Sequence, residues 1–450
     1  MKRKIYDKLL QWKQRDAQKF ALMIDGARRV GKSYIVEEFA KSEYDAYLLL
    51  DFSKVGSDVK VLFNDYLGDL DTFFMLLQNK MGVVLPPGRS LVIFDEVQLF
   101  PRAREAIKHL VKDGRYHYLE TGSLISISKK SDEILLPSEE LHVSLYPMDF
   151  EEFLWATGHD LMMPMILDFF MRRKPLGASM HRQVMDLFRQ YMVVGGMPQA
   201  VSEFVESHDL ALVDRTKRAI LNLYRGDIRK YAGRLVERVE RIWDEIPSLL
   251  SRHEKRFRPS SVGIGTRMRD CKDAFQWLKD AMTVNLCYNS TEPNVGLRLN
   301  LDNAKLKCYL GDTGLLISHA FDENGLSAEG IHSRLLFDRL EINEGMLVEN
   351  VVAQMLVASG RNLYFHVQSS KSDASSRLEI DFLIAKSKVG RRRNISPIEV
   401  KSGRNYTLKS LGKLMARYRQ YLDEPYVIHS KDLAVKDGVV YLPFYMTPLL

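Results

Sequence analysis

The chain has 450 residues, of which 46% are hydrophobic and 27% charged, and this composition is typical of a globular protein rather than a disordered one. It is too long for one compact core, so we expect about two to four domains. No run of roughly eighteen apolar residues occurs, and the basic N-terminus lacks the apolar segment of a signal peptide. These features argue against a membrane protein and favour a cytoplasmic location.

The net charge leaves the kind of partner open, whereas the cysteine content argues against two kinds of site. The formal net charge of +7 permits a polyanionic partner without requiring one, since a mildly basic solvated surface has the same charge. The three cysteines, Cys271, Cys287 and Cys308, are spread without a C-x-x-C pair. Neither a disulfide framework nor a zinc site is therefore indicated.

The first third of the chain alternates apolar runs with helical patterns. The runs lie at residues 20–25, 46–52, 91–96, 116–122 and 141–147. Unbroken apolar character, rather than strict alternation, is typical of strands that are buried on both faces of a parallel sheet. Residues 1–150 are therefore expected to form an open α/β sheet with helices on both sides.

A phosphate-binding loop is predicted directly after the first of these strands. The motif G-x-x-x-x-G-K-[ST] is matched without a mismatch by Gly26, Ala27, Arg28, Arg29, Val30, Gly31, Lys32 and Ser33. Its glycines would let backbone N–H groups turn toward phosphates at the start of the following helix. Lys32 would bridge the β- and γ-phosphates, and the Ser33 hydroxyl would bind Mg²⁺. ATP and Mg²⁺ are the expected cofactors, and a structural glycine turn is the alternative.

The strand at residues 91–96 supplies the acidic partner of that loop. Asp95 would hold Mg²⁺ at the carboxyl edge of the sheet, and the next residue, Glu96, could polarise the attacking water. An exposed acidic strand end is the alternative. At the end of the next strand, Thr121 or Ser123 could sense the γ-phosphate, unless this segment is only a strand-end turn.

Helical periodicity replaces the strand pattern between residues 151 and 232, interrupted by the GGMP segment at 195–198. From about 236 to 310, helical segments precede two strand patterns, which suggests a winged helix-turn-helix. Such a domain could place the helix at 269–282, or the helix before it, in a DNA major groove, with Arg267, Arg269 and the basic run at 252–258 facing phosphates. Small winged helices also serve as plain connectors, and that alternative stays open.

The last region combines a helix, three strands and a basic helix. Asp381, followed by Glu399 and Lys401, matches the D…E-x-K core of restriction-type nucleases, and Glu349 on the preceding helix could add a third carboxylate. Such acids would bind Mg²⁺ while Lys401 stabilises the scissile phosphate or orients water. Two alternatives remain, a silenced site that binds nucleic acid without cutting it and acids paired with lysine in a structural sheet. The basic run Arg391–Arg393 could contact a DNA or RNA backbone or form an exposed loop.

Six motifs together resemble one protein family. They are IDGARRVGKS, FDEVQ, TGS and LYPMDFEEFLW in the first third of the chain, and GGMP and GDTGLL (311–316) further on. The chain resembles prokaryotic AAA-type P-loop ATPases whose C-terminal half is a domain of unknown function with a restriction-endonuclease-like ending, PD-(D/E)xK. The resemblance covers nearly the whole chain. It implies a sheet whose sensor strand lies between the two strands that carry the P-loop and Asp95.

The resemblance also implies an oligomer in which a neighbouring subunit supplies an arginine to the nucleotide. Arg225 and Arg229 are the candidates, and an ordinary charged helix face is the alternative. The expected fold class is thus α/β, with four regions: a P-loop AAA-type ATPase core at 1–150, a helical lid at 151–232, a winged helix-turn-helix domain at 233–318 and a restriction-endonuclease-like domain at 319–450.

The expected function is ATP binding and magnesium-dependent ATP hydrolysis that acts on, or is regulated by, nucleic acid. The alternative is a nucleotide-dependent switch, without nuclease activity, that binds a protein partner. Expected partners are ATP, DNA or RNA, and further copies of the chain, but no membrane.

Overall fold

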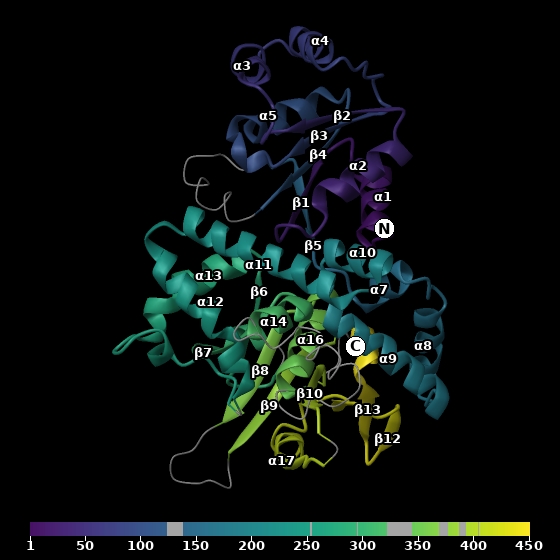
Figure 1. Ribbon diagram of the computed structural model, residues 1–450, viewed down its shortest axis with the longest axis vertical. Helices are drawn as coiled ribbons and strands as arrows, with labels where there is room; N and C mark the ends of the chain where they lie inside the picture. Colours follow the sequence, from purple (N-terminus) through teal and green to yellow (C-terminus); the bar gives the residue numbers. More distant parts are fainter. Residues whose placement is uncertain are drawn as a thin grey trace. The chain divides into compact units, whose positions relative to one another are not determined.

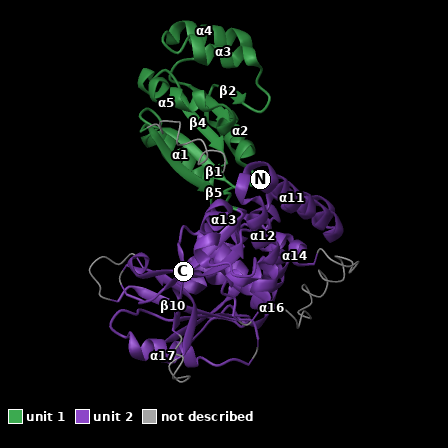
Figure 2. Cartoon of the chain, turned by 90° about the vertical axis from the view of Figure 1, so that its left-hand side faces the viewer, with its two compact units in different colours: residues 1–146, 280–282 green, residues 147–279, 283–450 purple. Residues whose placement is uncertain are grey.

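The computed structural model describes residues 1–123, 138–252, 254–294, 296–321, 344–368, 377–386, 393–403 and 405–450 (Figure 1). The chain divides into two compact units, residues 1–146 with 280–282 and residues 147–279 with 283–450 (Figure 2). None of the helices in the ranges just given is long and apolar enough to cross a membrane.

The first unit contains a five-stranded sheet in the order β2-β3-β4-β1-β5, and all of its pairings are parallel. The strands are β1 (Ala21–Gly26), β2 (Ala46–Asp51), β3 (Ser90–Asp95), β4 (His117–Gly122) and β5 (Glu140–Leu145). Every residue of β1, β3 and β4 is buried, as unbroken apolar runs predict. The predicted parallel α/β sheet is confirmed, with β4 between β1 and β3.

Helices cover both faces of this sheet because successive residues of each strand point to opposite sides. The helices of the unit are α1 (Ile5–Arg15), α2 (Lys32–Glu43), α3 (Ser57–Asp65), α4 (Leu70–Met81) and α5 (Pro101–Asp113), with a 3₁₀ turn, η1, at Val97–Leu99. Leu22 and Ile24 pack in one core with α1 and α2, whereas Met23 packs in a second core with α3, α4 and α5. These two cores hold the carboxyl ends of β1, β3 and β4 together at one edge.

The second unit begins with helices and continues into an eight-stranded sheet. Its first helices are α7 (Phe150–Ala156), α8 (Met162–Met171), α9 (Ala178–Val194), α10 (Pro198–Ser207), α11 (Leu210–Tyr231), α12 (Val236–Ser251) and α13 (Met268–Asp280). Later come α14 (Thr313–Ala320), α16 (Glu344–Ala358) and α17 (Lys409–Arg417), with 3₁₀ turns at Gly233–Leu235, Pro259–Ser261, Leu297–Asn300 and Phe444–Leu449.

The strands of the large sheet come from residues 284–443. They are β6 (Val284–Ser290), β7 (Leu301–Leu310), β8 (Leu363–Gln368), β9 (Leu378–Ala385), β10 (Ile395–Lys401), β11 (Tyr426–His429), β12 (Ala434–Lys436) and β13 (Val439–Pro443), in the order β12-β13-β11-β10-β9-β8-β6-β7. Antiparallel pairs β8–β9 and β9–β10 are followed by the parallel pair β10–β11. Helix α17 packs against β9, and α16 packs against β6, β7, β8 and β10.

The predicted winged-helix domain is wrong in the placement of its hairpin. Strands β6 and β7 do form an antiparallel hairpin after α12 and α13, but β6 also pairs in parallel with β8, joining Cys287 to Leu363. The hairpin is therefore the edge of the eight-stranded sheet, and the predicted boundary at 318 cuts through that sheet. A helix–helix–hairpin pattern is local, whereas the parallel partner of β6 lies far along the chain. The pattern alone therefore could not reveal this pairing.

The GGMP and GDTGLL motifs pack against each other within the second unit. Gly195, at φ 84°, ends α9, and the backbone N–H of Gly196 donates to the buried carboxylate of Asp312 at 2.5 Å. A Cβ on Gly196 would lie 2.1 Å from the carbonyl oxygen of Met148, so only glycine fits there. Close packing accounts for both motifs.

Candidate nucleotide site and C-terminal carboxylate cluster

The loop between β1 and α2 has the shape that its glycines predict. Gly31 lies at φ 96° directly before α2, and a Cβ on Gly26 would lie 2.5 Å from the carbonyl oxygen of Leu145. Between them the loop buries its apolar residues and exposes its arginines: Ala27 and Val30, and Arg28 and Arg29. The N-terminus of α2 thus presents backbone N–H groups that have no partner within the helix, the usual arrangement for binding phosphate.

The ammonium of Lys32 lies inside this loop. Its Nζ donates to the carbonyl oxygens of Gly26 and Ala27 at 2.8 and 3.1 Å, and the residue is only 7% exposed. Burial lowers the pKa of Lys32, and the nearby carboxylates of Glu96 and Asp95 only partly oppose that effect. Both bonds go to backbone oxygens, so the lysine can exchange them for phosphate oxygens without breaking an ion pair.

Three predicted residues from three elements meet at the carboxylate of Asp95. Its Oδ1 accepts a hydrogen bond from Ser33 Oγ on α2 at 2.9 Å and another from Thr121 Oγ1 on β4. A serine hydroxyl and a carboxylate oxygen this close are the hard oxygen ligands that Mg²⁺ prefers, so the site fits the ion. Of the two predicted sensor residues, Thr121 is the one that contacts Asp95.

Glu96, the residue directly after Asp95, has an unusual backbone conformation. Its φ of 52° lies in the left-handed region, which costs a residue other than glycine about 1–2 kcal/mol. The Glu96 carboxylate accepts a hydrogen bond from Nε2 of Gln98, and its backbone N–H lies 3.4 Å from Thr121 Oγ1. Strain of this kind is common at functional sites, where it aims a side chain.

Gln98 is a residue whose contact the sequence did not predict. It is 7% exposed, and a Cβ on Gly122 would lie 2.5 Å from its Oε1, so the glycine makes room for it. The only signal was an amide side chain two residues after Glu96. Because Glu96 has a left-handed backbone conformation, the direction of the Gln98 side chain could not be read from the sequence.

The predicted arginines of α11 form ion pairs within the chain. Arg225 pairs with Asp244 at 3.1 Å, and Arg229 pairs with Glu240 at 2.8 Å, both linking α11 to α12. Exposed pairs of this kind are worth about 0–1 kcal/mol, so they could be exchanged for another partner. That either arginine reaches the nucleotide of a neighbouring subunit stays a prediction.

Several basic residues of the predicted DNA-binding segment also contact acids. Arg256 and Arg258 pair with Glu254 at 3.0 and 3.2 Å, and Arg269 lies 3.7 Å from Asp270. Arg267 donates its backbone N–H to the same aspartate. Arg391 and Arg392 lie outside the described residues, and Arg393 lines a small pocket beside α17.

The four predicted nuclease residues come together on β9, β10 and α16. Asp381 of β9 accepts a hydrogen bond from the backbone N–H of Val400 at 2.8 Å, which ties it to β10. Glu399 and Lys401 of β10 form an ion pair with each other. Burial, followed by the charge of Asp381, raises the pKa of Glu399 to about 7.

The sequence analysis did not place four further polar residues in this cluster. They are Lys255, Lys307, Tyr309 and Glu379, of which Lys307 and Tyr309 lie on β7. Lys307 Nζ lies 3.3 Å from Glu349 and 3.7 Å from Asp381. Within the described ranges, no group of three or more histidine, cysteine or acidic side chains is arranged to hold a metal ion.

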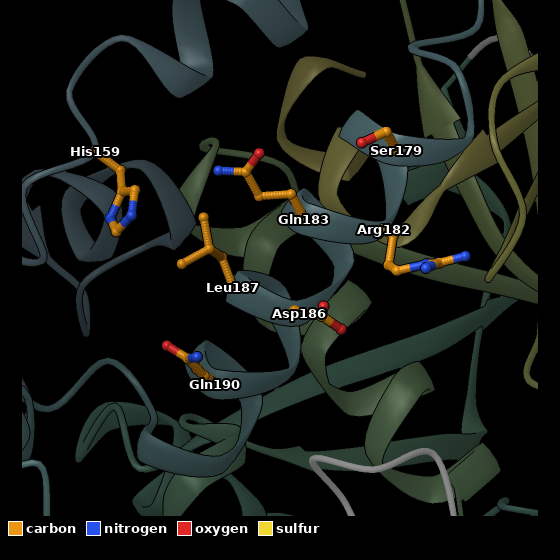
Figure 3. A pocket seen from close by; sticks show the side chains of 7 residues that line it. All are labelled: His159, Ser179, Arg182, Gln183, Asp186, Leu187 and Gln190. Carbon is orange, nitrogen blue, oxygen red and sulfur yellow. The ribbon is translucent and has the colours of Figure 1, made fainter.

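A separate pocket opens on the surface of α9 and contains none of the predicted site residues. Figure 3 shows its lining side chains: His159, Ser179, Arg182, Gln183, Asp186, Leu187 and Gln190. All but His159 come from one helix.

The parallel sheet, the loop at residues 26–33 and the carboxylate of Asp95 define a P-loop nucleoside triphosphatase. Comparison with known families narrows that class, because residues 18–154 match the family model of an AAA domain. The protein therefore carries an AAA-type P-loop ATPase domain and is an ATP-binding ATP hydrolase, as predicted.

The remaining comparisons add less. Residues 185–326 and 344–446 match two domains of unknown function, DUF8612 and DUF4143. No protein of curated function matches the chain. Among solved structures, a Walker-type ATPase of Pyrococcus abyssi is similar over 71% of this chain and 95% of its own, at 14% identity and a TM-score of 0.39. A likeness so distant supports no argument, and the restriction-endonuclease-like ending stays a prediction.

Proposed function

We propose that the P-loop site hydrolyses ATP with Mg²⁺, using Glu96 as the general base. The convergence of Ser33 and Thr121 on one oxygen of Asp95, beside Lys32, carries this proposal. Ser33 and Asp95 would hold Mg²⁺, which neutralises charge on the phosphates when bound.

The protein's own groups then divide the work. Lys32 exchanges its bonds to the loop carbonyls for the β- and γ-phosphates. Glu96, aimed by its left-handed backbone and by the amide of Gln98, takes the proton of the attacking water. Thr121, on β4, would sense whether the γ-phosphate is present.

Hydrolysis by the wild-type chain is expected to need a divalent ion. Asp95→Asn is expected to weaken the binding of that ion. The amide replaces a charged oxygen ligand by a neutral one, so the Mg²⁺ concentration for half-maximal rate rises roughly tenfold or more. Phosphate release measured across a Mg²⁺ titration tests this. Asp51→Asn, at the end of β2, is the matched control. An unchanged Mg²⁺ dependence in Asp95→Asn would show that Asp95 does not hold the ion.

We further propose that the second unit couples this ATPase to nucleic acid. The net charge of +7 and the gathering of Asp381, Glu399 and Lys401 on adjacent strands support this reading. The pairing of Arg256 and Arg258 with Glu254 instead favours the alternative, a nucleotide-dependent switch with a protein partner, because paired arginines attract phosphates less. A homo-oligomer and a cytoplasmic location belong to both proposals.

ATP turnover in the presence of single- and double-stranded DNA and RNA separates the two proposals. Coupling to nucleic acid predicts that at least one of the four raises the rate, and that added salt removes the effect because phosphate contacts are screened. A rate that none of them changes, at low salt and over a wide concentration range, would favour the protein-partner switch.

A further inference from the structure

The centre of the C-terminal carboxylate cluster is filled by a lysine side chain. Lys307 of β7 is only 1% exposed, and its Nζ lies 3.2 Å from Glu379, 3.3 Å from Glu349 and 3.7 Å from Asp381 (Figure 1 shows the strands and α16). These acids come from two elements, α16 and β9. The ring of Phe365 lies 5.2 Å from the ammonium and adds a favourable cation–π contact. One ammonium thus joins three carboxylates.

The acids that Lys307 does not satisfy alone have further cationic partners. Glu349 also pairs with Lys255 and accepts a hydrogen bond from Tyr309. The remaining pairs are Glu379 with Arg256 at 3.9 Å and Glu399 with Lys401. The four acids Glu349, Glu379, Asp381 and Glu399 therefore lie among four cations, Lys255, Arg256, Lys307 and Lys401, so side chains of the protein pair with them without a metal.

The pKa values of Lys307 and Glu349 are shifted in the directions that this pairing favours. Burial alone would lower the pKa of Lys307, but Glu349, Asp381 and Glu379 outweigh it and raise that pKa above its ordinary value. For Glu349, burial alone would raise the pKa, but Lys255 and Lys307 bring that pKa down to about 2. Both groups are thus charged at neutral pH.

A divalent ion does not fit this arrangement. It would need oxygens of the same carboxylates at about 2.0–2.6 Å, which would place it within a few ångströms of the ammonium. Two positive centres so close in a buried site repel each other strongly. The Mg²⁺ predicted for this cluster therefore disagrees with the residues present.

We infer that the ammonium of Lys307 is the resident cation of this site and takes the place of a divalent metal. The cluster then joins β7, β9 and α16 by charge and supplies no metal-activated water to a phosphodiester. This inference concerns the second unit alone and does not rest on the function proposed for the P-loop.

Mn²⁺ binding to the full chain, followed by electron paramagnetic resonance without nucleotide, tests the inference. The measurement is made in an Asp95→Asn background, so that the P-loop carboxylate does not contribute. We expect the chain with Lys307 intact to show no Mn²⁺ site that depends on Asp381. Lys307→Ala should gain a site for about one Mn²⁺, since it leaves the carboxylates of Glu349, Glu379 and Asp381 around an open centre, and adding Asp381→Asn should remove it again.

Lys305→Ala is the matched control, because Lys305 lies on the same strand and pairs at the surface with Asp302, at 3.2 Å. It should gain no Mn²⁺ site. Saturable Mn²⁺ binding by the chain with Lys307 intact, abolished by Asp381→Asn, would overturn the inference even if Lys307→Ala failed to fold. A folded Lys307→Ala that bound no Mn²⁺ would overturn it as well.

Discussion

Lys32→Ala is expected to abolish detectable ATP binding. The ammonium of Lys32 lies inside the loop, and its Nζ donates to the carbonyl oxygens of Gly26 and Ala27. On binding, these bonds are replaced by charge-assisted hydrogen bonds to two phosphates, each worth about 1.5–3 kcal/mol. Losing both weakens affinity by roughly 10²–10⁴-fold. Equilibrium binding of a fluorescent ATP analogue measures the change.

The control for this variant lies on the same helix. Lys41 is about half exposed and pairs with Glu37 at 2.9 Å, so Lys41→Ala removes a lysine from α2 without touching the loop. It should bind the analogue as the wild type does. If Lys32→Ala kept wild-type affinity while remaining folded, residues 26–33 would not be the nucleotide site.

The nucleotide site could be predicted from the sequence because its determinants are local. The loop at residues 26–33 lies between a buried strand and a helix, and Asp95 ends another buried strand. Parallel pairing then brings their carboxyl ends to one edge of the sheet. What remained open was which of Thr121 and Ser123 faces Asp95, since a single hydrogen bond decides it.

The C-terminal cluster was only half predictable. Asp381, Glu399 and Lys401 lie on adjacent strands, so the motif placed them together correctly. Lys307 belongs to a hairpin that the sequence assigned to another domain, and nothing near it in the chain indicates that β6 would pair with β8. Lys307, which the sequence did not place in the cluster, supplies its cation and therefore decides whether a metal ion fits there.

Gln98 shows the same contrast between a residue that the sequence predicts and a contact that it does not. Its neighbour Glu96 was predicted from the strand that precedes it, but the contact between them depends on the left-handed turn at φ 52°. In a strand continuing past Asp95, Glu96 would have pointed to the face opposite Asp95, and Gln98 to the same face as Glu96. Local backbone strain, which a residue pattern does not encode, therefore sets the direction of Glu96, the proposed general base.

Glu96→Gln is expected to keep ATP binding and lose hydrolysis. The amide is nearly isosteric with the carboxylate, and its oxygen can still accept the hydrogen bond from Gln98 Nε2, so the turn at residues 96–98 should persist. It cannot accept a proton from water at neutral pH, and losing a general base slows turnover by roughly 10²–10⁴-fold. Phosphate release under saturating ATP measures the rate, and binding of the ATP analogue shows that the site is intact.

Glu105→Gln separates loss of the base from loss of a charge near the sheet. Glu105 lies on α5 and pairs with Arg102 at 2.9 Å at the surface, so its amide variant should hydrolyse ATP at the wild-type rate. Turnover of Glu96→Gln at that same rate would mean that another group takes the proton, and that the strained turn at Glu96 only shapes the site. Slow turnover with unchanged binding would instead leave a chain that holds ATP without consuming it. That variant could then show whether nucleic acid or a protein partner binds the ATP-loaded state.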